Sequence, residues 1–458
     1  MGTIIVSTVL GLLGLVFEML NLRKAIVAFT SIILIGLAGY SVVSYWDLNA
    51  GFYSNMIIID NYSIAFSVLL LVITGLLVAL SGEFFKREEN KISDYVSLFV
   101  FTLVGALMMV SYGNMAALFI GIEILSISLY VLAASNRKSL ASNEAGLKYF
   151  LMGAFATGFL LLGITLVYGV TGSFDVREIT FALSSGKSSP LLLTGILMLM
   201  VAMLFKASVA PFHFWAPDVY TGSPSLVTAL MSTVAKVAAF GAMFKLFSLA
   251  FRTQMPQVEP LLILFILVTL VIANFSALRQ NSVKRIMAFS GVSHAGFLLL
   301  SVVTSMYSDA SHLFYYATGY ALASVVAFTV IIYVSHVKGN DQVASFTGLV
   351  YERPALGVAL ILALLSLSGI PPLTGFLGKY LVLMDAVQEG YTYVAVVAIL
   401  MSIVSIYYYF KILIAVVQRP EQPGAFSCAP AIFTIVAWIG TLAIIVLGVI
   451  PNFFANLL

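Results

Sequence analysis

Long apolar runs separated by short polar connections fill the chain from end to end. A helix needs about 20 residues to cross the ~30 Å hydrocarbon layer of a membrane, so runs of that length predict membrane-spanning helices. The pattern contains no convincing strand and predicts an all-α polytopic membrane protein with about 14 transmembrane helices. The expected helices lie at residues 4–20, 25–45, 62–82, 95–111, 114–134, 147–170, 190–209, 225–250, 259–278, 285–305, 311–336, 354–370, 391–417 and 431–450.

Prolines interrupt two of these runs. The seventh run ends in LFKASVAPFHFWAPDVYTGSP, and the twelfth ends in GIPPLTG, after which a short apolar piece follows at 373–388. Proline breaks or kinks a helix because it lacks the backbone N–H and its ring collides with the preceding turn. Membrane helices tolerate such breaks when neighbours satisfy the freed carbonyls, so a packing explanation is open for each break taken alone. We expect the seventh and twelfth helices to be discontinuous.

The composition agrees with a membrane protein, since 61% of the 458 residues are hydrophobic and 9% are charged. The first run lacks a basic n-region and a cleavage site, so we expect it to be retained as a helix. A net charge of +3 is too small to indicate nucleic acid. Cys428 is the only cysteine, which excludes an internal disulfide and any iron–sulfur or zinc site built from several thiolates. Without a glycine-rich phosphate loop either, we expect no cofactor and no metal in this chain.

The basic residues are unevenly distributed over the connections. If the helices alternate in direction, the even-numbered connections hold only Arg177, Lys187 and Arg252. The positive-inside rule then places the odd connections in the cytoplasm and both termini on the periplasmic side. The run EFFKREENKISD, residues 83–94, is expected to be a solvated cytoplasmic loop. The odd-numbered connections hold thirteen basic residues: Arg23, Lys24, Lys86, Arg87, Lys91, Arg137, Lys138, Arg279, Lys284, Arg285, Lys338, Arg353 and Arg419.

Four ionisable residues lie deep inside apolar runs: Glu123, Lys206, Lys236 and Lys379. Each charge costs roughly 2.5–3.5 kcal/mol on the membrane-insertion scale. One explanation is structural, with a buried ion pair between Glu123 and a lysine and the other lysines in an inert polar pocket. The other is a proton relay, because a desolvated lysine, unlike an arginine, can give up its proton. We favour the relay, since three lysines outnumber the one carboxylate.

Several other polar residues are weaker candidates. His294 is equally compatible with proton transfer and with a hydrogen-bonded core position, whereas His213, between two prolines, is expected to be structural. Lys148 enters the sixth predicted helix and stands four residues after Glu144, which is also the spacing of a helix salt bridge. Two further acidic residues have structural interpretations, a helix N-cap for Asp60 and a turn for Asp218.

Polar centres recur at a nearly constant interval. The pairs Lys206 and Lys379, Glu123 and His294, and Lys236 and Lys411 are separated by 173, 171 and 175 residues. The interval suggests two five-helix units, helices 4–8 and 9–13. Because five is odd, consecutive units enter the membrane from opposite sides and form an inverted repeat, an arrangement typical of transporters. The expected division is three helices in 1–91, the repeats in 92–252 and 253–418, and a last helix in 419–458.

Three segments resemble signature regions of a known family. FIGIEILSISLYVLAA, FKASVAPFHFWAPDVYTGSPSLVTALMSTVAKVAAF and LLSLSGIPPLTGFLGKY are similar to the antiporter-like membrane subunits of respiratory complex I, a NADH:quinone oxidoreductase. The resemblance covers helices 4–13. The fourteen-helix length and the lysine at Lys379, where M-type subunits carry glutamate, favour the N-type or subunit 2 branch. The D-type chains of multisubunit Na⁺/H⁺ antiporters share much of the motif set and are the alternative.

The resemblance implies a proton-translocating subunit of a bacterial inner-membrane translocase. It implies that FMN, iron–sulfur clusters and quinone are bound by partner subunits. The expected partners are the other membrane-arm subunits, including further antiporter-like chains, and membrane lipid. By matching motif positions, the implied relay consists of Glu123 modulating Lys206, Lys236 as the connecting lysine, Lys379 beside the exit path, and His294 and Lys148 on the central polar axis.

Overall fold

The computed structural model describes residues 1–20, 24–85, 92–186, 189–305, 310–420, 424 and 426–451. Some sequence predictions concern residues outside these ranges: the basic residues Arg23, Lys86, Arg87, Lys91 and Lys187, and half of the predicted loop 83–94. Every structural statement below refers to the described ranges.

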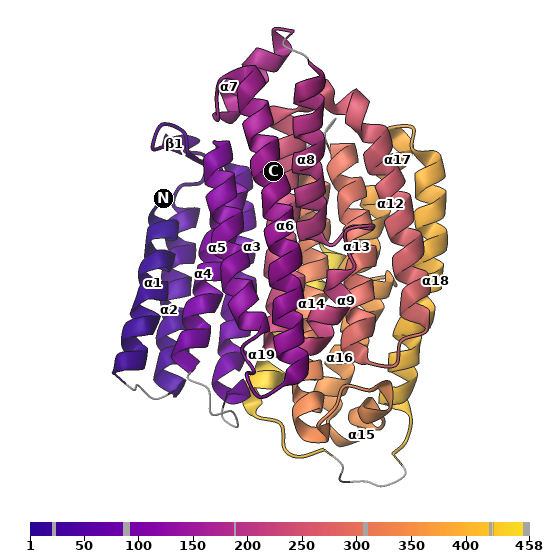
Figure 1. Ribbon diagram of the computed structural model, residues 1–458. Helices are drawn as coiled ribbons and strands as arrows, with labels where there is room; N and C mark the ends of the chain where they lie inside the picture. The colour runs from indigo at the N-terminus through magenta and orange to yellow at the C-terminus, as the bar shows by residue number, and fades with distance from the viewer. Residues whose placement is uncertain are drawn as a thin grey trace.

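The chain forms a bundle of long helices that run side by side (Figure 1). The first part contains α1 (Gly2–Met19), α2 (Lys24–Val43) and α3 (Asn61–Phe84). The middle part contains α4 (Ile92–Ser111), α5 (Met115–Ala133), α6 (Leu140–Thr171), α8 (Pro190–Ala207) and α9 (Trp215–Gly222). The last part contains α12 (Met255–Leu278), α13 (Val283–Ser305), α14 (Ser311–Lys338), α16 (Pro354–Ser368), α17 (Thr374–Gln388), α18 (Thr392–Val417) and α19 (Ala431–Val449).

The helices confirm the predicted all-α membrane fold. Within the described ranges, 12 helices are long and apolar enough to cross a membrane. Two shorter apolar helices, Gly2–Phe17 and Pro354–Ser368, lie where further crossings are expected. The count of fourteen crossings and the inverted repeat stay predictions.

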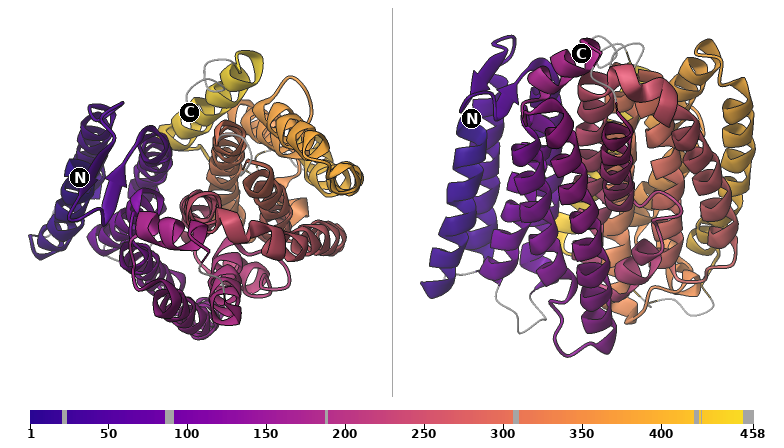
Figure 2. Two further views of the ribbon diagram at one scale, coloured as in Figure 1. Left: turned by 90° about the horizontal axis from the view of Figure 1, so that it is seen from above. Right: turned by 45° about the horizontal axis from the view of Figure 1, so that its top comes forward.

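The helix that spans 225–250 is not uniform. It consists of α10 (Ser225–Leu230), the π-helical segment η1 (Met231–Ala235), α11 (Lys236–Lys245) and a second π-helical segment, η2 (Leu246–Ala250). π-Helical turns are rare and often mark functional sites in α-helices. This composite helix, α13 and α14 are buried along their whole apolar windows. They form the centre of the bundle, while α1 and α2 lie at one edge and α18 at the other (Figure 2).

Short elements between the long helices escaped the sequence prediction. The strands β1 (Ala50–Phe52) and β2 (Ile57–Ile59) form an antiparallel hairpin, so the expectation of no strand is wrong. Three residues are too few for a period of two to be visible. The remaining short elements are the surface helix α7 (Val176–Ser184), the 3₁₀ turns η3 (Arg252–Gln254) and η4 (Val343–Phe346), and α15 (Leu349–Glu352).

The face of the bundle on which α1 begins also carries β1 and α7 (Figure 1). We call it the N-terminal face, and α6 begins on the opposite face. Asp60 follows β2 directly and caps α3, since its side chain accepts a hydrogen bond from the Ser63 amide. The predicted N-cap is therefore confirmed.

Both predicted interruptions are present. The helix α8 ends at Ala207, with Ser208 in the left-handed conformation, and α9 begins at Trp215. The helix α16 ends at Ser368, and α17 begins at Thr374. Side chains satisfy backbone groups at the first break, where the Trp215 indole donates to the carbonyl of Phe205 at 3.1 Å.

Close packing of α6 against α8 depends on glycines that face each other. A Cβ atom on Gly163 would lie 2.9 Å from the carbonyl oxygen of Gly195 and 2.8 Å from Leu199 Cγ. Small residues allow such close approach in membranes, where van der Waals contact drives helix association. The contact holds α8, and with it the first helix break, against α6.

We expect Gly163→Ala to lower the thermal midpoint of the purified membrane protein, because overpacking costs about 1–3 kcal/mol. Gly158→Ala in the same helix is the matched control, since a Cβ there meets nothing within 4 Å. Alanine is better than glycine in a helix by about 1 kcal/mol, so the control should keep or raise the midpoint. Equal midpoints for the two variants would contradict this account of the α6–α8 contact.

Candidate functional site

Buried basic residues lie in the middle of the bundle, between the two helix breaks. Lys206 comes from α8, Lys236 from α11, His294 from α13 and Lys379 from α17, and all four are buried. Glu123 lies on α5 and is partly buried. An ionised group costs several kcal/mol in such surroundings unless polar partners replace its water, so the partners of each group define the site.

Lys206 is linked to Glu123 through α5. Its Nζ donates a hydrogen bond to Ser126 Oγ at 2.5 Å, and Ser126 follows Glu123 by three residues on the same helix face. Glu123 Oε1 accepts a hydrogen bond of 2.7 Å from Thr157 of α6. The predicted partnership between Glu123 and Lys206 is therefore indirect, since each carries its own hydroxyl partner.

A small cavity connects these two hydroxyl partners. It is lined by Ser126, Tyr130, Thr157 and Lys206, among others, and its volume is about 10 Å³. This volume is close to the least that can hold one water molecule. The space between Lys206 and the threonine that binds Glu123 has a mainly apolar lining with a few polar groups, and its volume matches a single water.

Lys206 and Lys379 both lie at the carboxyl end of an interrupted helix. Lys206 is in the last turn of α8 itself. Lys379 belongs to α17, but its Nζ donates at 3.1 Å to the carbonyl oxygen of Ser368, the last residue of α16. Unpaired carbonyls and the helix dipole make this end of a helix favourable for cations. An ammonium group therefore lies beside each break, and at the second break a freed carbonyl is its acceptor.

Lys236 occupies a different kind of site. It is 2% exposed, and its Nζ donates at 2.5 Å to the backbone carbonyl of Gly291 in the middle of α13. The Tyr320 ring of α14 lies 5.8 Å from the ammonium. A Cβ on Gly291 would stand 3.1 Å from Nζ and 3.2 Å from Tyr320 Oη, so glycine leaves the space that Lys236 uses.

His294 lies between the surroundings of Lys236 and those of Lys379. Its ring is 4.9 Å from that of Tyr320, which contacts Lys236. Nδ1 is 2.7 Å from the hydroxyl of Tyr316, and Nε2 is 3.2 Å from the hydroxyl of Tyr409. Both ring nitrogens thus meet hydroxyls that donate or accept, so either tautomer of the imidazole is satisfied.

Lys148 does not join this central group. It forms ion pairs with Glu144 at 2.7 Å and with Asp218 at 3.0 Å, and Asp218 also pairs with Arg285 at 3.2 Å. The predicted helix salt bridge to Glu144 is confirmed. The assignment of Asp218 to a turn is wrong, because it lies in α9, where Pro217 fits the first helical turn. These four residues form a cluster near the start of α6, at the face opposite the N-terminal face.

The structure leaves His213 apart from these groups. It is buried in the first break, beside Phe214, and its Nδ1 has no hydrogen-bond partner in the described part of the chain. The central group and His213 therefore share no contact among those described.

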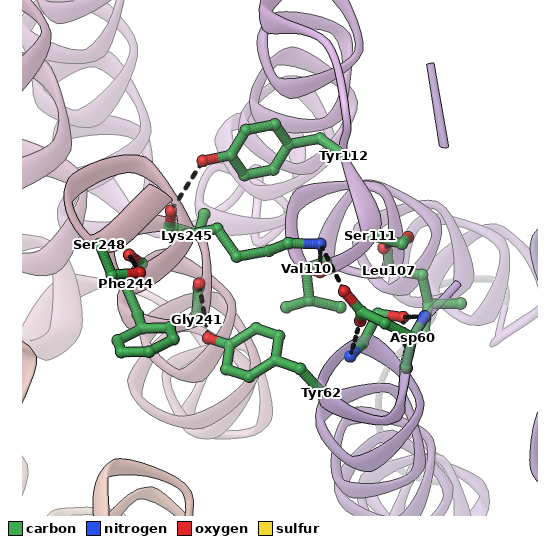
Figure 3. A network of polar contacts seen from close by, with 12 residues as sticks. Asp60, Tyr62, Leu107, Val110, Ser111, Tyr112, Gly241, Phe244, Lys245 and Ser248 are labelled. Atoms are coloured by element: carbon green, nitrogen blue, oxygen red, sulfur yellow. Dashed lines mark hydrogen bonds and ion pairs between the residues drawn. The ribbon is translucent and has the colours of Figure 1, made fainter. Parts of the chain in front are cut away.

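Sequence reasoning missed two buried lysines. Lys284, counted as part of a connection, is buried at the start of α13 and donates at 2.9 Å to the carbonyl of Ser223. Lys245 is buried at the end of α11, 3.6 Å from Asp60 (Figure 3). The available signal was position, since Lys245 lies inside the apolar run 225–250 and Lys284 directly before the run 285–305.

The chain matches the sequence model of the family described as NADH:quinone oxidoreductase/Mrp antiporter, transmembrane, over residues 113–405. It is 46% identical to the NADH-quinone oxidoreductase subunit N of Flavobacterium psychrophilum over 100% of both chains. Identity to the subunit N of Cytophaga hutchinsonii is 40%, over 99% of this chain and 98% of the relative.

Two solved structures share the fold. A chain of respiratory complex I from Thermus thermophilus with bound aureothin is 31% identical, with a TM-score of 0.86 over 99% of this chain and 98% of that chain. A chain of the Mrp complex from a Dietzia species is 18% identical, with a TM-score of 0.90 over 99% and 95%. The Mrp likeness concerns the fold alone, whereas the relatives named subunit N match this chain over its length. The chain therefore belongs to the NADH:quinone oxidoreductase/Mrp antiporter family and, within it, to the subunit N branch.

Proposed function

We propose that this chain is the proton-translocating subunit N of a membrane-bound NADH:quinone oxidoreductase, and so part of a translocase. Its relatives carry that name over the full length, and a 31% identical chain of the same fold belongs to respiratory complex I. The observation that carries the proposal is the group of buried basic residues between the two helix breaks. Such residues in a membrane are costly and characteristically line proton paths.

In the proposed relay, a change of charge at Glu123 acts on Lys206. The two are joined through Ser126, Thr157 and the cavity between them. Two unit charges about 4 Å apart interact by about 4 kcal/mol at an effective dielectric constant of 20. Moving a proton against 100 mV of membrane potential costs about 2.3 kcal/mol. Glu123 and Lys206 are farther apart than this, and at about 7 Å the interaction is still about 2.4 kcal/mol, which is comparable with the cost of one transfer step.

The middle of the relay runs from Lys236 to Lys379 by way of His294. Tyr320 contacts both Lys236 and His294. The imidazole takes a proton on one nitrogen and releases one from the other, and the hydroxyls of Tyr316 and Tyr409 are in place to pass it. Lys379, at the carboxyl end of α16, is the last buried lysine of this series.

The orientation is part of the proposal. Basic residues of the described connections concentrate on the face opposite the N-terminal face, which we infer to be cytoplasmic by the positive-inside rule. The cluster of Glu144, Lys148, Asp218 and Arg285 lies there, and we assign proton uptake to it. The N-terminal face is then periplasmic, and the membrane is the bacterial inner membrane.

The partners and cofactors follow from the family. The chain works beside the other membrane-arm subunits, among them further antiporter-like chains, and within membrane lipid. We infer that FMN, iron–sulfur clusters and quinone are held by partner subunits. The single cysteine supports this inference, because a cluster or a zinc site built from several thiolates is excluded.

A D-type chain of a Na⁺/H⁺ antiporter is the alternative. The structural similarity to the Mrp chain shows that such a subunit has the same fold. The 46% identity to subunit N nevertheless favours the oxidoreductase. Co-purification separates the two, because only an oxidoreductase would bring flavin and iron–sulfur subunits with this chain.

We expect Lys236→Met to abolish most NADH-driven proton translocation by the assembled complex in membrane vesicles. Methionine fits a buried site but carries no proton, and each 1.36 kcal/mol added to the barrier slows transfer about tenfold. Lys411→Met is the control, since Lys411 bonds to Gln280 and Asn281 at the end of α12, away from the central group. Native translocation in an assembled Lys236→Met complex would refute the relay.

A second variant tests the geometry around Lys236. Gly291→Ala places a methyl group 3.1 Å from Nζ, which must lengthen its hydrogen bond, so translocation should fall several-fold while the complex still assembles. Gly296→Ala on the same helix is the control, because its methyl group meets the flexible Leu270 side chain at a similar 3.0 Å. An equal loss in both variants would mean that strain in α13, and not displacement of Lys236, is responsible.

A further inference from the structure

Two buried lysines, Lys245 and Lys284, have no part in the relay proposed above, and Lys245 is the one that lies beside a carboxylate and a cavity. Lys245 is 4% exposed and ends α11, the helix that Lys236 begins. Nine residues separate the two, which is about 13.5 Å along the axis and half a turn around it. The two ammonium groups therefore leave one helix on opposite sides. The π-helical segments η1 and η2 lie directly before and after this ten-residue helix.

Lys245 has weak partners for a buried ammonium group (Figure 3). Its Nζ lies 3.6 Å from Asp60 Oδ2 and 3.4 Å from the carbonyl oxygen of Val110. The rings of Tyr62 and Tyr112 lie on either side, with centroids 5.9 and 5.8 Å away. Their hydroxyls donate to backbone carbonyls of α11 rather than to the lysine. The ammonium thus has several polar and aromatic neighbours, but it forms a short hydrogen bond with none of those described.

Asp60 connects this lysine to a cavity at the N-terminal face. The side chain of Asp60 is 29% exposed, whereas that of Lys245 is 5% exposed. Both line a cavity of about 450 Å³, together with Arg177 and Arg252, which are exposed. Such a cavity has room for several water molecules. The carboxylate therefore stands between the buried ammonium and solvent.

The charge of the cavity favours the last step, in which a proton leaves Asp60 for bulk water. In the described part of the chain, Asp60 is the only carboxylate lining it, against Lys245, Arg177 and Arg252. A positive mouth repels a proton that has been released and opposes its return. Tyr62 of α3 and Tyr112 after α4 are the other titratable groups that face the ammonium.

We propose that Asp60 and Lys245 form a proton-exchange pair between the helix that carries Lys236 and the N-terminal face. The inference rests on the proposed function. An N–H bond of Lys245 breaks and an O–H bond forms on Asp60, and water in the cavity then takes that proton. Lys245 regains a proton from the interior of the bundle, and no electron moves. A proton arriving at Lys236 promotes release, because two ammonium groups on one helix repel each other at low dielectric.

A purely structural ion pair explains the contacts less well. Asp60 already caps α3 through Oδ1, 2.7 Å from the Ser63 amide, and the 3.6 Å to Lys245 exceeds a hydrogen bond. Buried ion pairs contribute little net stability, because desolvation offsets their attraction. An apolar residue at 245 would satisfy packing at lower cost, whereas an ammonium beside a solvated carboxylate is what exchange requires.

Asp60→Asn tests the pair without removing the helix cap, since Asn caps a helix as well as Asp. It keeps an oxygen for Ser63 and loses the proton-accepting carboxylate. Asp175→Asn is the matched control, because Asp175 caps α7 on the same face but does not line the cavity. Lys245→Met removes the other partner. The measurement is the ratio of protons translocated to NADH oxidised in membrane vesicles that contain the whole complex.

We expect Asp60→Asn, Lys245→Met and their double variant to lower this ratio as far as Lys236→Met does, with native complex yield and a native ratio in Asp175→Asn. If Lys236→Met loses translocation while Asp60→Asn and Lys245→Met keep it, the proposed proton-exchange pair is overturned, but the proposed relay is retained. A native ratio in Lys236→Met overturns the relay itself. A third outcome is that Asp60→Asn and Lys245→Met reduce the complex yield, while the complexes that remain have a native ratio. That outcome identifies a structural ion pair and overturns the proposal.

Discussion

A buried ammonium group needs hydrogen-bond acceptors, and this need constrains the whole centre of the bundle. An isolated charge in hydrocarbon is too costly to keep, and the carbonyls of an uninterrupted membrane helix already accept from its own amides and are mostly covered by side chains. One way to obtain an acceptor is to break a helix. The carboxyl end of α16 lies inside the protein, and Lys379 donates to its last carbonyl. Lys206 lies in the last turn of α8, beside the other break.

The same constraint accounts for the glycines and hydroxyls around the lysines. Lys236 reaches a carbonyl of an unbroken helix only because Gly291 has no side chain, and Lys206 uses the hydroxyl of Ser126 as its acceptor. These partners are neutral. A neutral acceptor stabilises an ammonium less strongly than a carboxylate does. A neighbouring charge can therefore still change the protonation state of each lysine.

Much of this arrangement was predictable from the sequence. Apolar run length gave the helices, prolines gave both interruptions, and ionisable residues inside apolar runs gave Glu123, Lys206, Lys236 and Lys379. The failures concern information that is not local. Asp218 and Arg285 are 67 residues apart, and the ion pair that joins them depends on how α9 meets α13. The acceptor of Lys236 is a backbone carbonyl, which every residue type has, so the sequence does not reveal it. The π-helical segments do not change the hydrophobic periodicity visibly.

The two breaks hold their lysines in different ways, and the difference has a mechanical consequence. Lys206 is part of the half-helix whose carboxyl end it occupies, so it moves with that end. Lys379 is attached to α17 and reaches across the break to the carbonyl of Ser368 on α16. A relative movement of the two halves separates Lys379 from its acceptor, whereas no movement of α9 need do so for Lys206. In the proposed relay, the first site responds to nearby charge through Ser126 and Glu123, and the second responds to geometry as well. A series that begins at a charge-sensitive site and ends at a movable one can release a proton at its far end without disturbing its start.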